Sequence, residues 1–146
     1  MIKKSTEEIA NEMDSAATFE ELQNIVEQYA IGRERFGDRL LELCAIYRTT
    51  PAMLQRRVAM SKSLFYAVIN GTRKPSKETV IKIALSLGVS IEEADELLKI
   101  SGHKELYVKN RDDAIILFGI RNKKSIYEIN ELLRSYHSEM KLLDEE

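Results

Sequence analysis

The sequence is poor in residues that interrupt helices or form covalent and metal cross-links. Its 146 residues include only six glycines, two prolines, two histidines and one cysteine, and no tryptophan. Because so few helix breakers accompany apolar residues at helical spacing, the sequence predicts an all-α fold. One cysteine cannot form an internal disulfide, and there is no cysteine cluster for zinc. The simplest location for such a chain is the cytoplasm.

Long apolar runs are also missing. No stretch approaches the roughly 20 residues of a membrane span, so we expect no membrane partner. The first 14 residues contain two lysines but no apolar block, unlike a signal peptide.

The usual signs of enzymes are missing too. There is no glycine-rich phosphate loop and no nucleophile motif, and His103 and His137 lack the spacing of metal ligands. Cys44 falls within an apolar stripe, which indicates a buried side chain. Asp112 and Asp113 stand where a helix should begin, so a favourable interaction with the helix dipole is their expected role. We expect no catalytic residue, no metal and no cofactor.

Charge is distributed unevenly along the chain. Between Arg48 and Lys82 there are eight basic residues and one acid, a local balance of 8 − 1 = +7 in a chain whose net charge is −2. The rest of the chain therefore carries −9. A solvated charged face is one interpretation, and a surface that neutralises nucleic-acid phosphates is the other.

The basic segment contains two short helical patterns that meet at a corner. Thr50-Pro51 is a helix start signal, and Ser61 can cap a second helix that ends at Asn70-Gly71. A basic loop follows over residues 72–76. Two helices that cross at a short turn fit the major groove of DNA.

These residues resemble the helix-turn-helix of the lambda-repressor/Cro type, often labelled XRE, without gaps from Thr50 to Leu98. The resemblance rests on three sets of positions. They are the expected buried residues Leu54, Val58, Met60, Phe65 and Val68; the loop Asn70-Gly71 with Arg73-Lys74-Pro75-Ser76; and the segment 84–90, ALSLGVS. The resemblance implies a DNA-binding transcriptional regulator of bacterial or phage type, with residues 33–101 as the DNA-binding domain.

The resemblance also implies which residues contact DNA. By position, Lys62 and Ser63 meet base edges, and Tyr66 and Ala67 lie one turn further on. Ser61 contacts a phosphate. Arg73 and Lys74 contact the backbone from the loop, while Arg56, Arg57 and Lys77 add to the positive field.

Several positions depart from the family pattern. Pro51 stands where a glutamine usually clamps a phosphate, and Gln55 replaces a small residue, which implies a looser or rotated corner. Ala59 replaces the usual turn glycine. The second helix is also unusually apolar over residues 64–69, LFYAVI, so that some apolar surface should face outward. An outward apolar patch favours an alternative function, a protein-interaction adaptor or antirepressor on the same fold.

Helical segments flank this domain on both sides. Residues 1–32 predict two helices, Ser5–Asp14 and one after a capping box at Thr18, that pack on the domain or dock a partner. A helix over about residues 33–48 should bury Cys44 among its apolar residues. Residues 102–146 predict a helix pair, with one helix over 111–121 and a long one over 125–143.

The C-terminal pair repeats part of the preceding one. SIEEADELL at 90–98 aligns with SIYEINELL at 125–133, with six of nine residues identical at an offset of 35. An apolar stripe follows the expected last helix. It comprises Ile126, Ile129, Leu132, Leu133, Tyr136, Met140 and Leu143. The stripe either packs within the chain or forms a homodimer, and we expect a homodimer through the C-terminal helices.

Overall fold

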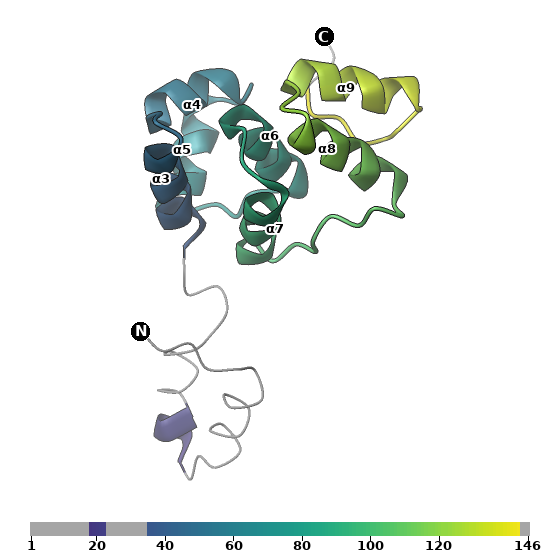
Figure 1. Ribbon diagram of the computed structural model, residues 1–146. Coiled ribbons are helices and arrows are strands. Elements are labelled where there is room, and N and C mark those ends of the chain that lie inside the picture. Colours follow the sequence, from purple (N-terminus) through teal and green to yellow (C-terminus); the bar gives the residue numbers. More distant parts are fainter. Residues whose placement is uncertain (1–17, 23–34, 144–146) are drawn as a thin grey trace. The chain divides into compact units, whose positions relative to one another are not determined.

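The computed structural model describes residues 18–22 and 35–143 (Figure 1). The chain divides into two compact units, residues 1–33 and residues 34–146, and each is considered by itself. In the first unit, residues 19–22 form a helical turn that Thr18 caps by accepting a hydrogen bond from the Glu21 backbone N–H at 3.1 Å. The predicted helix Ser5–Asp14, and most of the one after Thr18, lie outside the described residues.

The second unit is all-α, as predicted. Its helices are α3 (Phe36–Ile46), α4 (Pro51–Arg57), α5 (Lys62–Asn70), α6 (Lys77–Leu87), α7 (Ile91–Ile100), α8 (Arg111–Arg121) and α9 (Ile126–Ser135). The first of these is shorter than predicted, since Arg35 is its N-cap and Arg48 has a left-handed φ of 55°. None of the helices in the described ranges is long and apolar enough to cross a membrane.

Local signals in the sequence explain where the helices begin and end. From α4 onward, each N-cap side chain accepts a hydrogen bond from the backbone N–H three residues later. These N-caps are Thr50, Ser61, Ser76, Ser90, Asn110 and Ser125. Gly71 and Gly88 end α5 and α6 with φ of 80° and 74°, a conformation that glycine adopts without steric cost.

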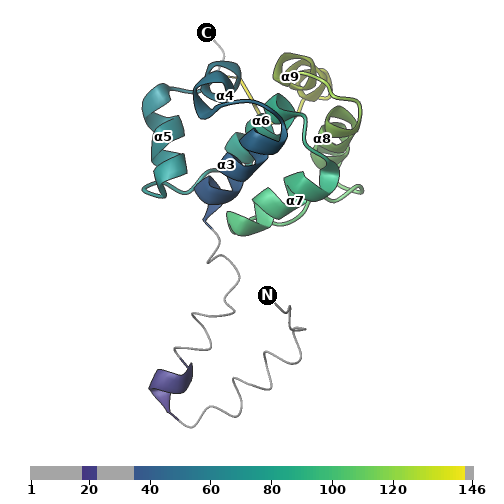
Figure 2. The same cartoon turned by 60° about the vertical axis from the view of Figure 1, so that its left-hand side comes forward.

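One apolar core runs through the second unit, with α6 at its centre. Seven of the eleven residues of α6 are buried. Figure 1 and Figure 2 show α6 between the group α3–α5 and the pair α8–α9. The core includes Leu40 and Cys44 from α3 at one side and extends to Leu133 and Leu142 at the other. The C-terminal helices therefore share a core with the segment that precedes them.

The predicted duplication is visible in the structure. Both α7 and α9 begin with a complete capping box, Ser90 with Glu93 and Ser125 with Glu128. Left-handed residues recur 35 positions apart, at Gly88 and Lys123 and again at Gly102 and His137.

After Gly102 and after His137, the chain turns back onto the helix that it has just completed. Asp95 accepts a hydrogen bond from the Leu106 N–H, and its counterpart Asn130 accepts one from the Leu142 N–H.

The prediction of a helix over residues 125–143 is wrong. α9 ends at Ser135, and His137 reverses the chain with a φ of 57°. Leu142 is buried on the returning segment. Apolar residues recur through this region because the returning segment also contributes to the core, and their spacing imitates a continuing helix. Met140 and Leu143 therefore do not extend a stripe on α9.

Candidate nucleic-acid interface

The corner between α4 and α5 is held by side-chain hydrogen bonds. Ala59 takes up a left-handed φ of 52°, as its place in the turn requires. The Gln55 amide donates to the Met60 carbonyl at 3.2 Å, across the corner. The Lys82 ammonium donates to the Ala59 carbonyl, also at 3.2 Å. The looser or rotated corner expected from Gln55 stays a prediction, and the Gln55 side chain connects the two sides of the corner.

Close contact with α3 determines where α5 lies. Phe65 and Val68 of α5 are buried in the core. A Cβ atom placed on Gly37 of α3 would lie 2.0 Å from the Ile69 carbonyl oxygen, so only glycine permits this approach of the two backbones. The buried face of α5 is therefore fixed against α3, and its opposite edge is left to solvent.

The predicted DNA-contacting residues fall into two groups. Ser61, Lys62 and Ser63 at the start of α5 are exposed, whereas Tyr66 and Ala67 are half-buried. The Tyr66 ring packs edge-on against Phe65, with ring centroids 5.4 Å apart.

The backbone around Ala67 attaches the basic loop to α5. The Ala67 carbonyl accepts hydrogen bonds from the Thr72 N–H and hydroxyl and from the Arg73 N–H. The loop that carries Arg73 and Lys74, both exposed, is thereby tied to the end of the helix.

The apolar residues of α5 largely pack inward. Leu64 and Ile69 are half-buried and contact the core. Within the described ranges, α5 carries none of the exposed large apolar side chains. The apolar surface that residues 64–69 present outward therefore comes only from half-buried side chains.

Cations lie on α5, on the loop that follows it and on the last turn of α4. Arg56, Arg57, Lys62, Arg73 and Lys74 are exposed. None of these five side chains forms an ion pair or hydrogen bond with another described residue.

Lys77 differs from the expectation that it adds to the positive field. Its ammonium lies 2.7 Å from a carboxylate oxygen of Asp113, which is buried and neutralises it. Asp113 also accepts a hydrogen bond from the Tyr107 N–H at 2.9 Å. Asp113 thus does more than interact favourably with the dipole of α8. Its carboxylate also connects the start of α6 to the start of α8.

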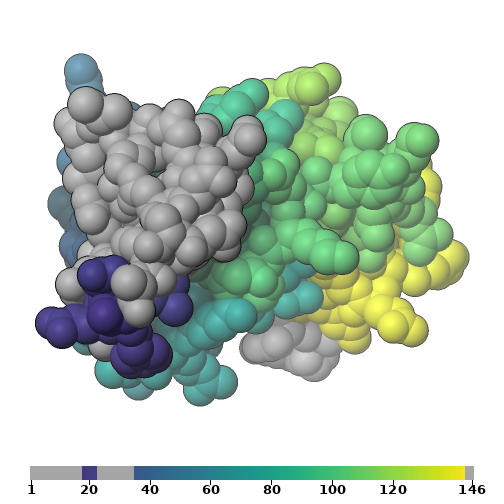
Figure 3. Space-filling model, turned by 90° about the horizontal axis from the view of Figure 1, so that it is seen from below, coloured from purple at the N-terminus to yellow at the C-terminus, as the bar shows by residue number. Residues whose placement is uncertain are grey.

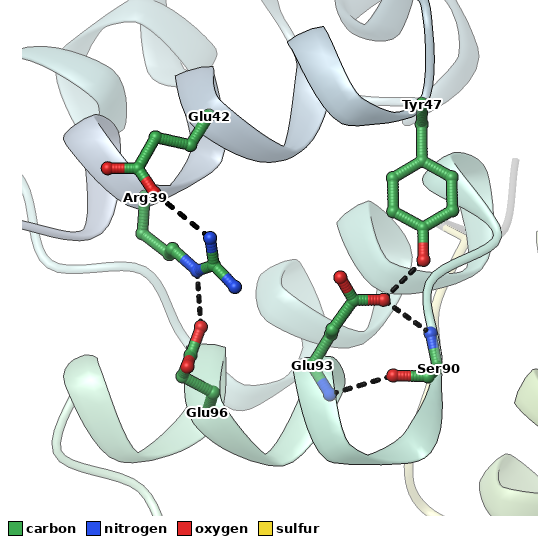
Figure 4. Close-up of polar contacts among 6 residues, drawn as sticks. All are labelled: Arg39, Glu42, Tyr47, Ser90, Glu93 and Glu96. Atoms are coloured by element: carbon green, nitrogen blue, oxygen red, sulfur yellow. Dashed lines mark hydrogen bonds and ion pairs between the residues drawn. The ribbon is translucent and has the colours of Figure 1, made fainter.

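Polar contacts between α3 and α7 brace the domain behind this surface (Figure 4). Arg39 pairs with Glu96, and the Tyr47 hydroxyl donates to Glu93. This bond raises the pKa of Tyr47. Burial favours the neutral form of Glu93, but hydrogen bonds from the Ser90 N–H, the Tyr47 hydroxyl and the Ser90 hydroxyl outweigh burial and lower its pKa. Glu93 belongs to the capping box of α7, which is a local pattern, but no local pattern connects it to Tyr47, which is 46 residues away.

A second exposed surface lies on α8 and α9. Phe118, Tyr127 and Tyr136 are 48%, 64% and 53% exposed. They line two adjoining grooves of about 760 and 410 Å³, with half-buried Leu132 between them. We call these four residues the C-terminal face. The predicted stripe contained Leu132 and Tyr136, but its members Ile126, Ile129 and Leu133 are buried in the chain's own core.

Other candidate chemistry has structural explanations. Cys44 is buried, and burial raises the pKa of its thiol, which disfavours the reactive thiolate. One imidazole nitrogen of His103 lies 2.9 Å from the Pro75 carbonyl oxygen. Within the described ranges, no three His, Cys, Asp or Glu side chains are grouped as a metal site.

The comparisons with known proteins do not identify a family. No family model, curated protein or solved structure shows a significant match to the chain. The function proposed below therefore depends on the geometry of α4 and α5.

Proposed function

We propose that the chain is a DNA-binding transcriptional regulator in which α4 and α5 form a helix-turn-helix of the lambda-repressor/Cro type. The observation that carries this proposal is the exposed edge of α5. It presents a polar N-terminus beside cations that pair with no other described residue, and none of its large apolar side chains is exposed. A helix that enters the major groove requires such an edge, because base edges and phosphates are polar.

The residues have different roles in this proposal. Lys62 donates to guanine O6 or N7, and Ser63 contacts a neighbouring base pair. Tyr66 and Ala67 are half-buried, and one turn further along α5 they shape the surface that faces the groove. The Ser61 hydroxyl accepts the Leu64 N–H at 3.2 Å and retains its own hydrogen to donate to a phosphate.

Arg73 and Lys74 bind the DNA backbone from the loop, where no other described residue neutralises their positive charge. Arg56 and Arg57 strengthen the field. Pro51 supplies no phosphate clamp, and Thr50 caps α4 instead.

The regulator acts as a homodimer through the C-terminal face. Its groove is rimmed by Lys124, Glu128 and Glu131. Lys124 pairs with Glu128 at 3.6 Å and Glu131 pairs with Arg134 at 3.8 Å, so the rim presents no unpaired like charges that would oppose an isologous contact with a second copy. Two copies then read half-sites about 34–36 Å apart, or a multiple of that distance.

DNA binding is tested by selecting duplexes from a random pool at moderate salt and then measuring affinity against salt concentration. Lys62→Ala should relax specificity, whereas Arg73→Ala should weaken binding to all sequences and reduce the salt slope by about 0.9. Arg121→Ala is the matched control, since this exposed cation at the end of α8 pairs with no other described residue. If no sequence is enriched and binding does not depend on salt, the proposal fails.

The dimer is tested by sedimentation of the Phe118→Glu variant. Phe118 is 48% exposed, so the change should leave the fold intact and convert dimer to monomer. Ile46→Glu is the control, because Ile46 is 60% exposed on α3, away from this face. A monomeric wild type, or a Phe118→Glu variant that remains dimeric, contradicts the dimer.

One observation favours a second function, a protein-interaction adaptor or antirepressor. The C-terminal face is apolar enough to bind a different protein, and α4 has no phosphate clamp at Pro51. Association with another protein that survives nuclease treatment and high salt would favour this function, since DNA binding weakens steeply with salt.

A further inference from the structure

The segment Gly102–Asn110, which joins α7 to α8, is an ordered strap. The Leu106 and Tyr107 N–H groups each donate to a carboxylate, Asp95 and Asp113, at 2.9 Å. The Asn110 N–H donates to the Tyr107 carbonyl at 2.9 Å and closes a turn. These bonds hold the strap backbone against α7 and α8, so the backbone positions from which its side chains project are fixed.

The strap begins beside the basic loop that follows α5. A Cβ atom placed on Gly102 would lie 2.9 Å from the Lys74 ammonium nitrogen. The His103 imidazole contacts the Pro75 carbonyl. Further along, Asp113 binds both Lys77 and the Tyr107 N–H, so that one carboxylate connects the strap to the start of α6. The two segments therefore form one continuous surface.

The side chains that the strap presents suit a nucleic-acid backbone. Lys104 and Lys109 are exposed and form no ion pair or hydrogen bond with another described residue, and the same holds for Arg111 where α8 begins. The strap's one acid, Glu105, is paired with Lys99. Tyr107 and Val108 are 58% and 67% exposed between the lysines. Figure 3, a view from below, shows green atoms of this part of the chain at the surface.

We propose that the strap is a second DNA contact, which binds phosphates and sugars of the duplex flanking the site read by α5. This inference rests on the proposed function. Lys104 and Lys109 neutralise phosphates, while the rings and methyls of Tyr107 and Val108 lie against deoxyribose. Such contacts carry no sequence information, and they position the protein and raise its affinity.

Charge supports a nucleic-acid partner over a protein one. Together with Arg73, Lys74 and Arg111, the two strap lysines make five cations that pair with no other described residue, in a chain of net charge −2. Each cation that neutralises a phosphate releases condensed counterions, so the contact should appear in the salt dependence of binding.

The test compares two double variants of the full chain that remove the same charge. Lys104→Ala/Lys109→Ala removes the strap cations. Arg121→Ala/Arg134→Ala removes two exposed cations from α8 and α9, of which Arg134 is paired with Glu131 at 3.8 Å. Affinity for a selected duplex is measured by fluorescence anisotropy between about 50 and 200 mM salt. Circular dichroism and urea unfolding establish that both variants are folded.

The strap variant should lose about tenfold in affinity, and its salt slope should fall by about 1.8, the value for two phosphate contacts. Its sequence preference should stay that of the wild type. The control should keep the wild-type slope. Shortening the duplex to the bases read by α5 should weaken the wild type to the level of the strap variant.

Failure of the strap contact can be separated from failure of DNA binding. If the wild type binds duplex with a steep salt slope and the strap variant matches it, the strap contact is wrong and DNA binding stands. Equal losses in both double variants would show a general charge effect and would also overturn the strap contact. If the wild type shows no salt-dependent duplex binding, both proposals fall.

Discussion

The two helix pairs α6–α7 and α8–α9 share a pattern and differ in what covers them. At the offset of 35, the buried residues Val80, Ile83 and Leu97 correspond to Ile115, Phe118 and Leu132. The first three are covered because α4 packs on α6 and α3 packs on α7. The corresponding face of the second pair has no such layer in the described chain, and its residues are half-buried or exposed. Equivalent sequence positions thus become core in one pair and surface in the other.

The pairs also differ in how their helices approach each other. Ala84 and Ala94 are both buried in the first pair, and their counterparts in the second are Gly119 and Ile129. A Cβ atom on Gly119 would lie 2.5 Å from the end of the Ile129 side chain. A small residue on each helix has been exchanged for a glycine opposite a large residue, which keeps the local volume similar.

The two pairs should differ most in how strongly truncation of Leu97 and of Leu132 destabilises the protein. Leu97→Ala should lower the free energy of unfolding by about 2–5 kcal/mol, because it empties a fully buried site. Leu132→Ala should cost about 1 kcal/mol or less, since its site is half open. Urea unfolding, at a concentration where the chain is monomeric, measures both. Equal losses would show that residues of the same chain cover the second face.

The Gly119–Ile129 contact provides a double-mutant cycle. Gly119→Ala should destabilise by about 1–3 kcal/mol through overpacking, because Ile129 is fully buried and cannot move aside. Ile129→Ala creates space, so Gly119→Ala should cost little in that background. The coupling is measured by urea unfolding of the four proteins. Additive losses would mean that the two side chains do not compete for the same volume.

The two capping boxes should respond differently to removal of their carboxylates. Glu93→Gln should cost about 1 kcal/mol, because Glu93 also accepts the Tyr47 hydroxyl and so connects α7 to α3. Glu128→Gln should cost less, since Glu128 is exposed and caps only its own helix.

The same residues predict how stability depends on pH. The folded pKa of Glu93 lies below its unfolded value, so its contribution is present above the unfolded value of about 4.5 and is lost as the pH falls through the folded pKa. Urea midpoints between pH 3 and 7 should therefore fall less steeply for Glu93→Gln than for the wild type. If the urea midpoints of the two proteins fall in parallel, Glu93 does not contribute to the pH dependence of stability.

The left-handed residues that end α7 and α9 should give the smallest effects, of opposite sign. Gly102→Ala should destabilise by about 1 kcal/mol, since an alanine is strained at a φ of 80°. His137→Gly should stabilise by about 0.5 kcal/mol, because it relieves the same strain at a φ of 57°. Thermal unfolding measures both changes. Destabilisation by His137→Gly would mean that the imidazole makes a contact that outweighs the strain.

Much of the fold could be predicted because its signals are local. Ser90 with Glu93, and glycine at positions 71 and 88, predict helix boundaries within a few residues. α8 has the predicted bounds, Arg111–Arg121. α9 does not, because His137 reverses the chain without the glycine that marks the same reversal at Gly102.

The candidate site was harder to predict because its properties depend on distant contacts. Lys62, Arg73 and Lys74 have their predicted exposure. Lys77 is neutralised by a carboxylate 36 residues away, and Leu64 and Ile69 pack against the core. Spacing along a helix shows which residues share a face, but it cannot show which partner reaches that face.

The sequence by itself determined the helical class, the caps and the repeat at an offset of 35, because each depends on residues only a few positions apart or on direct identity. Tertiary structure alone decided which repeat is covered, which lysine is neutralised and which segment lies beside the basic loop. Those outcomes depend on packing between helices far apart in the chain, whose energy no local pattern encodes.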